Sequence, residues 1–173
     1  MKKFGLAMTA MLLAVSMTAC ASNPSDSGEQ KLRIGIIQPA EHAALDSARE
    51  GFVDALADHG YVDGETIEID YQNAQGDSNT CSTIINNFVA EDVDLILANA
   101  TPALQAAQAG TSDIPVLGTS VTEYGVALGI DDFNGTVGNN ISGTSDLAPL
   151  DEQAAMLQEL FPDAKNVGLL YCT

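Results

Sequence analysis

The sequence predicts an α/β fold, with an open parallel sheet and helices on both faces. Short apolar runs typical of buried strands alternate four times with segments of helical periodicity, which is the pattern of parallel strands joined by right-handed crossovers. Hydrophobic residues make up 46% of the 173 residues, aromatic residues make up only 5%, and tryptophan is absent. The core must therefore consist mostly of Ala, Val, Ile and Leu, which suits an α/β domain.

The first half of this alternation covers residues 32 to 90. Leu32–Gln38 is apolar, rich in β-branched residues and ends at a proline, which predicts a strand. Glu41–His59 has apolar residues at helical spacing and is followed by glycine, the usual residue just past a helix. Thr66–Tyr71 alternates like a half-exposed strand, and Asn79–Ala90 has a second helical apolar face.

The second half begins with a strand that reads as fully buried. Asp94–Ala98 contains an uninterrupted apolar run, as a strand covered on both faces requires. Pro102–Ala109 predicts a short helix, and Ile114–Thr119 predicts the fourth strand. Val126–Ile130 is a candidate fifth strand, whereas the Gly- and Asn-rich stretch 134–145 shows little periodicity and predicts no regular element.

The last part of the chain predicts one more helix and one more strand. Asp151–Phe161 has helical periodicity, and Asn166–Tyr171 is a short apolar run. The inward side chains of this helix are expected to be Met156, Leu157, Leu160 and Phe161. No crossover helix follows the last strand, so we expect the sequence to be an N-terminal fragment of a longer protein.

The N-terminus predicts export and a lipid anchor. Residues 1–19 combine two lysines with a short apolar stretch, which is typical of a signal peptide and too short to span a bilayer. The leader closes on Met-Thr-Ala before Cys20, which resembles a bacterial lipobox whose cysteine becomes acylated. Residues 20–31 are small and polar, as a flexible tether would be. The alternative is a plain secretory signal cut near Ala19 or Ala21, with Cys20 incidental.

The charge balance excludes nucleic acid as a partner. The sequence has 24 acidic and six basic residues, and two of the basic residues, Lys2 and Lys3, lie in the predicted leader. A surface with so much negative charge repels phosphate backbones. Such a negative surface more often serves solubility, or tolerance of a salty habitat, than binding of a specific cationic partner.

The stretch Asp94–Gln105 places a buried strand directly before a helix N-terminus. The helix is expected to begin with Thr101 at the N-cap and Pro102 at the first helical position. First-turn N–H groups lack partners within the helix and carry partial positive charge. Such turns lie at the carboxyl edge of a parallel sheet, where ligands bind. We interpret residues 99–101 as an anion-binding lip, with an ordinary capped helix as the alternative.

Several blocks together resemble one protein family. The sequence blocks are IGIIQPAEHAALD, GYVDGETIEIDYQNAQGD, DLILANATPALQAA, IPVLGTSVTEYGVA, ISGTSDLAP and PDAKNVGLLY, which together span nearly all of residues 32–171. They resemble the tryptophan/tyrosine-type substrate-binding lipoproteins of ABC importers. Two departures are Glu123, near the place where the family usually has Asp, and Leu104, where Ala is common.

The resemblance implies a protein of two α/β lobes that close on an amino acid, with ABC permease subunits as partners and with no cofactor. Each lobe would be of the type I periplasmic-binding-protein class. Residues 32–145 would form the first lobe, and 146–173 would contain the crossover and the first helix and strand of the second lobe. The anchored protein would lie on the outer face of a membrane.

An amino-acid ligand needs hydrogen-bond donors for its carboxylate and acceptors for its ammonium group. The turns after the predicted strands supply both kinds of group. We expect hydroxyls of Thr101, Ser120 and Thr122 to meet the carboxylate, and Asp146 or Glu41 to meet the ammonium. For each hydroxyl the alternative is a helix cap or a loop hydrogen bond, and for Glu41 it is a favourable helix dipole. The full set of candidate ligand-binding residues is Gln38, Glu41, Asn99, Ala100, Thr101, Ser120, Thr122 and Asp146.

Two other classes of function stay open on the sequence alone. One is a flavodoxin-like or sugar-isomerase-like enzyme, which would need a nucleophile–base pair or a set of metal ligands. The sequence has no CxxC, GxSxG or Walker motif, and its two histidines have no partner at metal-ligand spacing. The other class is a ligand-sensing domain of a membrane receptor. We therefore expect a binding protein that is not an enzyme and holds no metal.

Overall fold

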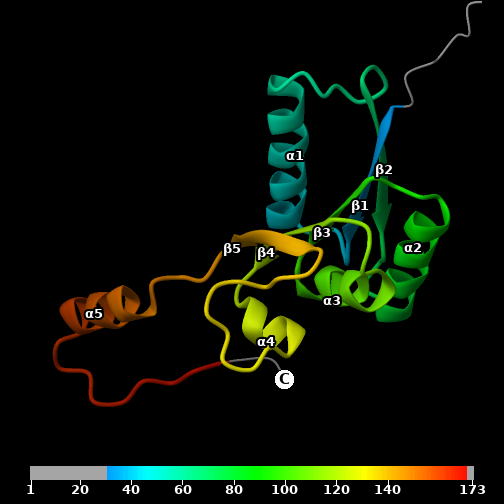
Figure 1. The fold of residues 1–173 in the computed structure, drawn as a ribbon. Helices are drawn as coiled ribbons and strands as arrows, with labels where there is room; N and C mark the ends of the chain where they lie inside the picture. The colour runs from blue at the N-terminus through cyan, green and yellow to red at the C-terminus, as the bar shows by residue number, and fades with distance from the viewer. Residues whose placement is uncertain (1–30, 171–173) are drawn as a thin grey trace, which may run out of the picture. The chain divides into compact units, whose positions relative to one another are not determined.

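The protein forms a five-stranded parallel sheet in a computed structural model that describes residues 31–170 (Figure 1). The strands lie in the order β2-β1-β3-β4-β5. The elements in chain order are β1 (Leu32–Gln38), α1 (Ala43–Asp58), β2 (Ile67–Asn73), α2 (Ser78–Ala90), β3 (Leu95–Asn99), α3 (Thr101–Gly110), β4 (Val116–Val121), α4 (Tyr124–Leu128), β5 (Ile141–Ser145) and α5 (Leu150–Leu160). The predicted leader, Cys20 and most of the predicted tether lie outside the described residues.

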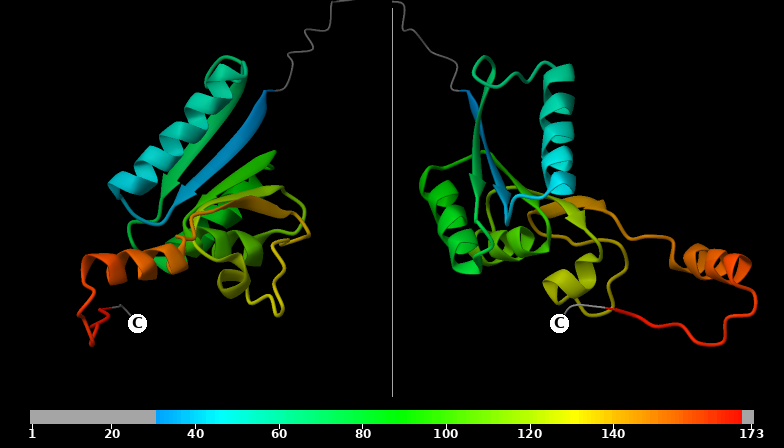
Figure 2. Two further views of the ribbon diagram at one scale, coloured as in Figure 1. Left: turned by 90° about the vertical axis from the view of Figure 1, so that its left-hand side faces the viewer. Right: turned by 180° about the vertical axis from the view of Figure 1, so that it is seen from behind.

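Helices cover both faces of the sheet, as the sequence predicts (Figure 2). On one face α1 packs through Phe52, Val53 and Leu56 against strand residues of β1, β2 and β3. On the other face α2, α3 and α4 enclose the larger core, in which Phe88 and Leu104 are fully buried. In the part of the chain that the structure describes, no helix is long and apolar enough to cross a membrane.

The central strands owe their apolar sequence to this double cover. In β1, Ile36 faces α1 whereas Ile37 faces the α2–α3 side, and both are fully buried. In β3, Leu97 and Ala98 divide between the same two faces. Successive residues of a strand point to opposite faces, so a strand covered on both sides must be apolar throughout.

All five strands are parallel, so their carboxyl ends meet at one edge of the sheet. β1 and β2 pair from Leu32↔Ile67 to Gln38↔Asn73. β3 and β4 pair as far as Asn99↔Thr119. The ladder between β4 and β5 shifts register between Gly118 and Val121, where β4 becomes irregular. This shift lies beside the strand ends that carry the predicted site.

The predicted fifth strand at Val126–Ile130 is wrong, because the chain forms the short helix α4 there. The Glu123 side chain accepts hydrogen bonds from the N–H groups of Gly125 and Val126, which caps the helix at its start. Gly129 ends the helix in a left-handed conformation, with φ of 64°. The cap and the glycine therefore outweigh the β-preference of the valine and isoleucine.

The fifth strand lies instead at Ile141–Ser145, inside the stretch for which the sequence predicts no regular element. Only Ile141 of this strand is buried, so the usual alternation is absent. Pairing with β4 creates the strand, and a Gly143↔Gly118 pair lies within the ladder. This information is not local to the segment, so the sequence pattern does not reveal it.

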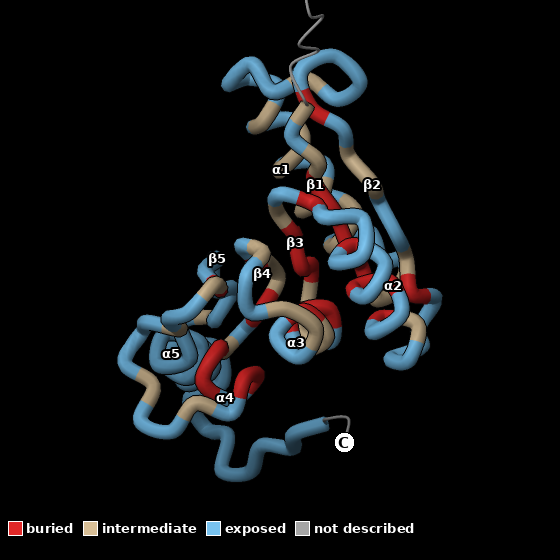
Figure 3. Tube along the Cα trace, turned by 45° about the vertical axis from the view of Figure 1, so that its right-hand side comes forward, coloured by how far each residue is buried: buried red, intermediate tan, exposed pale blue. Residues whose placement is uncertain are grey.

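The last predicted helix is confirmed as α5. No residue of α5 is buried (Figure 3). The four side chains expected to face inward, Met156, Leu157, Leu160 and Phe161, are all exposed. The predicted final strand is not formed by residues 166–170, which have no regular structure, because a strand needs a partner and none lies beside it.

Candidate functional site

The turn between β3 and α3 has a strained backbone at its centre. Ala100 has φ of 84° and ψ of 159°, a region that is essentially reserved for glycine. Its N–H donates to the carbonyl of Thr119 at 2.8 Å, and its carbonyl accepts from the N–H of Leu104 at 3.1 Å. Strain of this kind costs about 1–3 kcal/mol, and it persists where the surrounding structure fixes the backbone.

The N-terminus of α3 has no side-chain cap, in contrast to three other helices. α1 is capped by His42, whose Nδ1 accepts from the N–H of Ala44 at 3.2 Å. Asp77 caps α2 and Glu123 caps α4. The prediction that Thr101 is the N-cap is wrong: Ala100 holds that position, and Thr101 is the first residue of the helix. The first N–H groups of α3 are therefore left for a partner outside the helix.

The end of β4 lies next to this turn. Ser120 is half-buried and has φ of 56°, so its backbone is strained like that of Ala100. The hydrogen bond from Ala100 to Thr119 holds the two turns side by side. Thr122 follows at the exposed end of the strand. The structure thus brings Ala100 and Thr101 close to Ser120, and Thr122 follows two residues later in the chain.

Gln38 and Asn99 lie deeper, and both are fully buried. The Asn99 Nδ2 donates to the carbonyl of Leu45 at 2.7 Å and to Gln38 Oε1 at 3.3 Å. The Gln38 Nε2 donates to the carbonyl of Ala40 at 2.7 Å and to Asp46 Oδ1 at 2.9 Å. These amides tie the start of α1 to the ends of β1 and β3. Of the amide oxygens and nitrogens of these two side chains, Asn99 Oδ1 alone has no hydrogen-bond partner. A direct contact of either residue with a ligand stays a prediction.

The two candidate ammonium partners lie on opposite sides of β3 along this edge, one after β1 and one after β5. Glu41 is exposed in the loop that connects β1 to α1. Asp146 is exposed just after β5, and its N–H donates to the carbonyl of Val121 at 3.2 Å. Glu123, in contrast, uses both carboxylate oxygens to cap α4. Among residues 31–170, no cluster of three His, Cys, Asp or Glu side chains is arranged to hold a metal ion.

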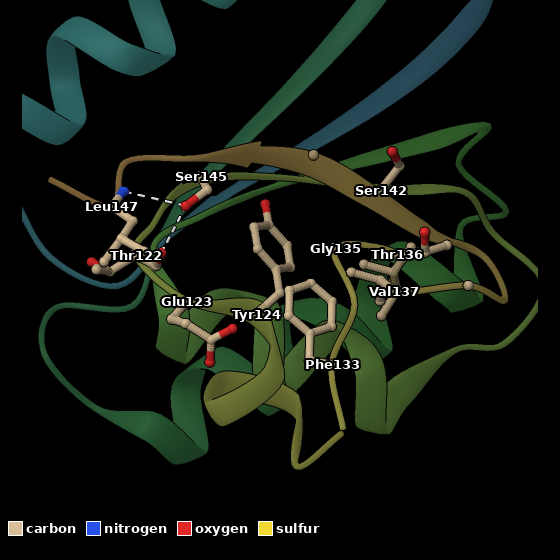
Figure 4. A pocket seen from close by; sticks show the side chains of 13 residues that line it. Thr122, Glu123, Tyr124, Phe133, Gly135, Thr136, Val137, Ser142, Ser145 and Leu147 are labelled. Atoms are coloured by element: carbon tan, nitrogen blue, oxygen red, sulfur yellow. Dashed lines mark hydrogen bonds between the residues drawn. The ribbon is translucent and has the colours of Figure 1, made fainter. Parts of the chain in front are cut away.

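Sequence reasoning did not find a pocket of about 450 Å³ that borders this edge (Figure 4). The rings of Tyr124 and Phe133 line the pocket below β5. Ser145 and Leu147 lie at the end of the pocket beside the carboxyl end of β5. The Tyr124 hydroxyl donates to the carbonyl of Thr144 at 3.1 Å. Burial raises the pKa of the Tyr124 phenol, and the charge of Asp146 adds to this shift.

Two glycines make room for the Tyr124 ring. Added Cβ atoms at Gly118 and Gly143 would both press against its hydroxyl. These glycines stand opposite each other in β4 and β5. A pair of glycines in neighbouring strands, followed by an aromatic residue, is the pattern in the sequence that could have indicated this packing.

Nearly all of the described chain matches a known family model. Residues 33–173 match the model described as ABC transporter substrate binding protein. The chain is also 42% identical, over an alignment of 183 residues, to the tyrosine-binding protein of Clostridioides difficile strain R20291. That alignment covers 99% of this chain and 52% of the relative, so the chain spans about half the length of the curated relative it matches.

Two solved structures share both sequence and fold with the chain. One is the ligand-free, open structure of a substrate binding protein with adhesive properties from Clostridium difficile, with 46% identity and a TM-score of 0.70. The comparison covers 78% of this chain and 45% of that one. The other is an ABC domain from Streptococcus pneumonia in complex with L-Trp, with 32% identity and a TM-score of 0.70. This second comparison covers 77% of this chain and 44% of the other. The chain belongs to the family of ABC transporter substrate binding proteins.

Proposed function

We propose that this chain forms the first lobe of an extracytoplasmic solute-binding protein that captures an amino acid, and that the amino acid is aromatic. The β3–α3 turn carries this proposal, because it is strained at Ala100, uncapped at α3 and fixed against the end of β4. The family match supports the binding role. The choice of ligand is supported by one relative named as tyrosine-binding and by another with L-Trp bound.

The chemistry of the turn suits a carboxylate. The first N–H groups of α3 provide donors and partial positive charge at the helix start. The hydroxyls of Thr101, Ser120 and Thr122 would add donors around the same point. The ammonium group would meet Asp146 or Glu41, or a group of the second lobe. A site of this kind only binds its ligand, and the proposal includes no catalytic step.

The parts of the chain then receive the following proposed roles. Residues 1–19 are the signal peptide, Cys20 carries the lipid, and residues 20–31 are the tether. Residues 32–145 are the first lobe, and 146–173 begin the second. The partners are the ABC permease subunits and, through the anchor, the outer face of the membrane. Replacing Cys20 by alanine should move the protein from the membrane fraction to the medium or periplasm, and unchanged retention would contradict the anchor.

The central test is a substitution at the start of α3 in the full-length product of the gene. Thr101→Ala removes one hydrogen bond to a charged group, worth about 1.5–3 kcal/mol, so the affinity for L-tyrosine or L-tryptophan should fall by about ten- to a hundredfold. Thr101 is not the N-cap, so the melting temperature of the ligand-free protein should stay close to that of the wild type. Titration calorimetry and thermal unfolding give the two quantities.

Two control variants make the result specific. Thr101→Ser keeps the hydroxyl and should bind almost as well as the wild type. Thr83→Ala makes the same chemical change on the exposed face of α2 and should leave the affinity unchanged. If Thr101→Ala binds like the wild type, the carboxylate does not contact this hydroxyl. If the wild type binds neither amino acid, the proposed ligand class is wrong.

A further inference from the structure

Ser145 forms a bridge between two segments that meet at the edge of the proposed site (Figure 4). Its hydroxyl donates to the carbonyl of Thr122 at 2.7 Å and accepts from the N–H of Leu147 at 3.2 Å. Thr122 belongs to the turn between β4 and α4, and Leu147 to the segment that leaves β5. One hydroxyl therefore joins a wall of the site to the segment that exits the sheet.

The turn that Ser145 holds is fixed from its other end as well. Glu123 caps α4 through both of its carboxylate oxygens, at 2.9 Å to the N–H of Gly125 and 2.5 Å to the N–H of Val126. Ser120, just before the turn at the end of β4, has the left-handed φ of 56°. A strained backbone keeps its shape only where neighbouring bonds over-determine it. Ser145 supplies the bond from the β5 side.

The exit segment is held by two more bonds. The N–H of Asp146 donates to the carbonyl of Val121 at 3.2 Å, and the Tyr124 hydroxyl donates to the carbonyl of Thr144 at 3.1 Å. Residues 121–124 and residues 144–147 thus form one hydrogen-bonded unit. Among these bonds, that of Ser145 is made by a side chain that can be replaced without altering the backbone or the aromatic packing.

We propose that Ser145 is a positioning residue for ligand binding: by holding the Thr122 carbonyl it fixes the turn that follows Ser120 and presents Thr122 to the ligand. The inference rests on the proposed function. The bond restricts rotation of the peptide group after Thr122, and so fixes the path of the turn between β4 and α4. Because the same hydroxyl accepts from Leu147, ligand contact at the turn also tightens the first residues of the exit segment.

The experiment uses the full-length gene product and compares matched variants of β5. Ser145→Ala should weaken L-tyrosine or L-tryptophan binding by about tenfold, the size expected for one lost hydrogen bond. Ser145→Thr keeps the hydroxyl and should bind like the wild type, whereas Ser145→Val has the same shape and should bind like Ser145→Ala. Ser82→Ala is the control, because Ser82 is exposed on α2 and its hydroxyl donates only to the Ser78 carbonyl of its own helix.

Hydrogen exchange at the amide of Leu147 gives a readout that a purely structural role would not change. In the wild type the ligand should slow this exchange, and in Ser145→Ala the ligand should have no effect on it. Equal affinity of Ser145→Val and Ser145→Thr, or ligand protection of Leu147 in Ser145→Ala, would overturn the positioning role. A wild type that binds neither amino acid would instead overturn the proposed function, and the positioning role with it.

Discussion

The helices α3 and α5 have similar sequence patterns but very different surroundings. Both begin beside a proline and without a side-chain cap, and both carry apolar residues at helical spacing. α3 buries Ala103, Leu104 and Ala107 against the sheet, whereas α5 buries nothing. Periodicity therefore specifies a helix with an apolar side, but burial depends on whether a second surface lies opposite that side.

A pair of leucine substitutions should give the largest difference between the two helices. Leu104→Ala removes a fully buried side chain and should lower the free energy of unfolding of this chain by about 2–5 kcal/mol. Leu160→Ala makes the same change on α5, where the side chain is exposed, and should alter it by less than about 0.5 kcal/mol. Urea unfolding of the two variants measures both values. Similar losses would show that α5 packs as α3 does.

A pair of glycine substitutions tests the same contrast between the sheet and the tail. A Cβ at Gly143 would lie 2.8 Å from the backbone nitrogen of Gly118 and press on the Tyr124 hydroxyl, so Gly143→Ala should cost about 1–3 kcal/mol. Nothing lies within 4 Å of a Cβ at Gly168, so Gly168→Ala should be close to neutral. Thermal unfolding distinguishes them. A neutral Gly143→Ala would mean that β4 and β5 separate easily.

Unlike α5, α2 has a side-chain cap, Asp77, and this cap should make the free energy of unfolding depend on pH. The N–H and hydroxyl of Thr80 hold the pKa of Asp77 below its ordinary value of 3.8. A lowered pKa in the folded state stabilises the protein above pH 3.8, and this contribution is lost as the pH falls through the folded-state pKa. Asp77→Asn keeps a capping group that does not titrate. Its melting temperature should therefore fall less than that of the wild type between about pH 5 and about pH 3, and parallel curves would contradict this role.

Removing α5 altogether should have the smallest effect. Residues 151–170 have no buried side chain, so their loss on deletion of residues 151–173 removes almost no apolar burial from the sheet domain. The free energy of unfolding should change by less than about 1 kcal/mol. Chemical denaturation of the shortened and complete chains compares the two. A clear loss of stability on deletion would place this segment in the first core.

The sequence predicted the elements whose cause is local. The first three strands, α1, α2 and α3 each follow from a run or a periodicity within the segment itself. The run Val126–Ile130 was wrongly predicted as a strand, because the capping carboxylate of Glu123 precedes it and Gly129 interrupts it. Ile141–Ser145 was missed because its strand depends on pairing with β4 and not on its own alternation.

For the candidate site, the sequence predicted which edge of the sheet the residues occupy, but not the geometry of the turns there. The chain order of strands and helices was enough to put Thr101, Ser120 and Thr122 at one edge of the sheet. The positive φ of Ala100, which shifts the N-cap from Thr101, is a consequence of the tertiary contact with Thr119. The burial of Gln38 and Asn99 depends on where α1 begins, a relation between three segments that no single pattern contains.

The strand order β2-β1-β3-β4-β5 has a consequence for how the domain forms during translation. β3 pairs beside β1, β4 beside β3, and β5 beside β4. Once the first two strands have met, every later strand therefore joins a neighbour that has already left the ribosome. Chains fold from the N-terminus as they are made, and short loop closures cost the least entropy. The sheet grows at a single advancing edge, in the order in which its strands are synthesised.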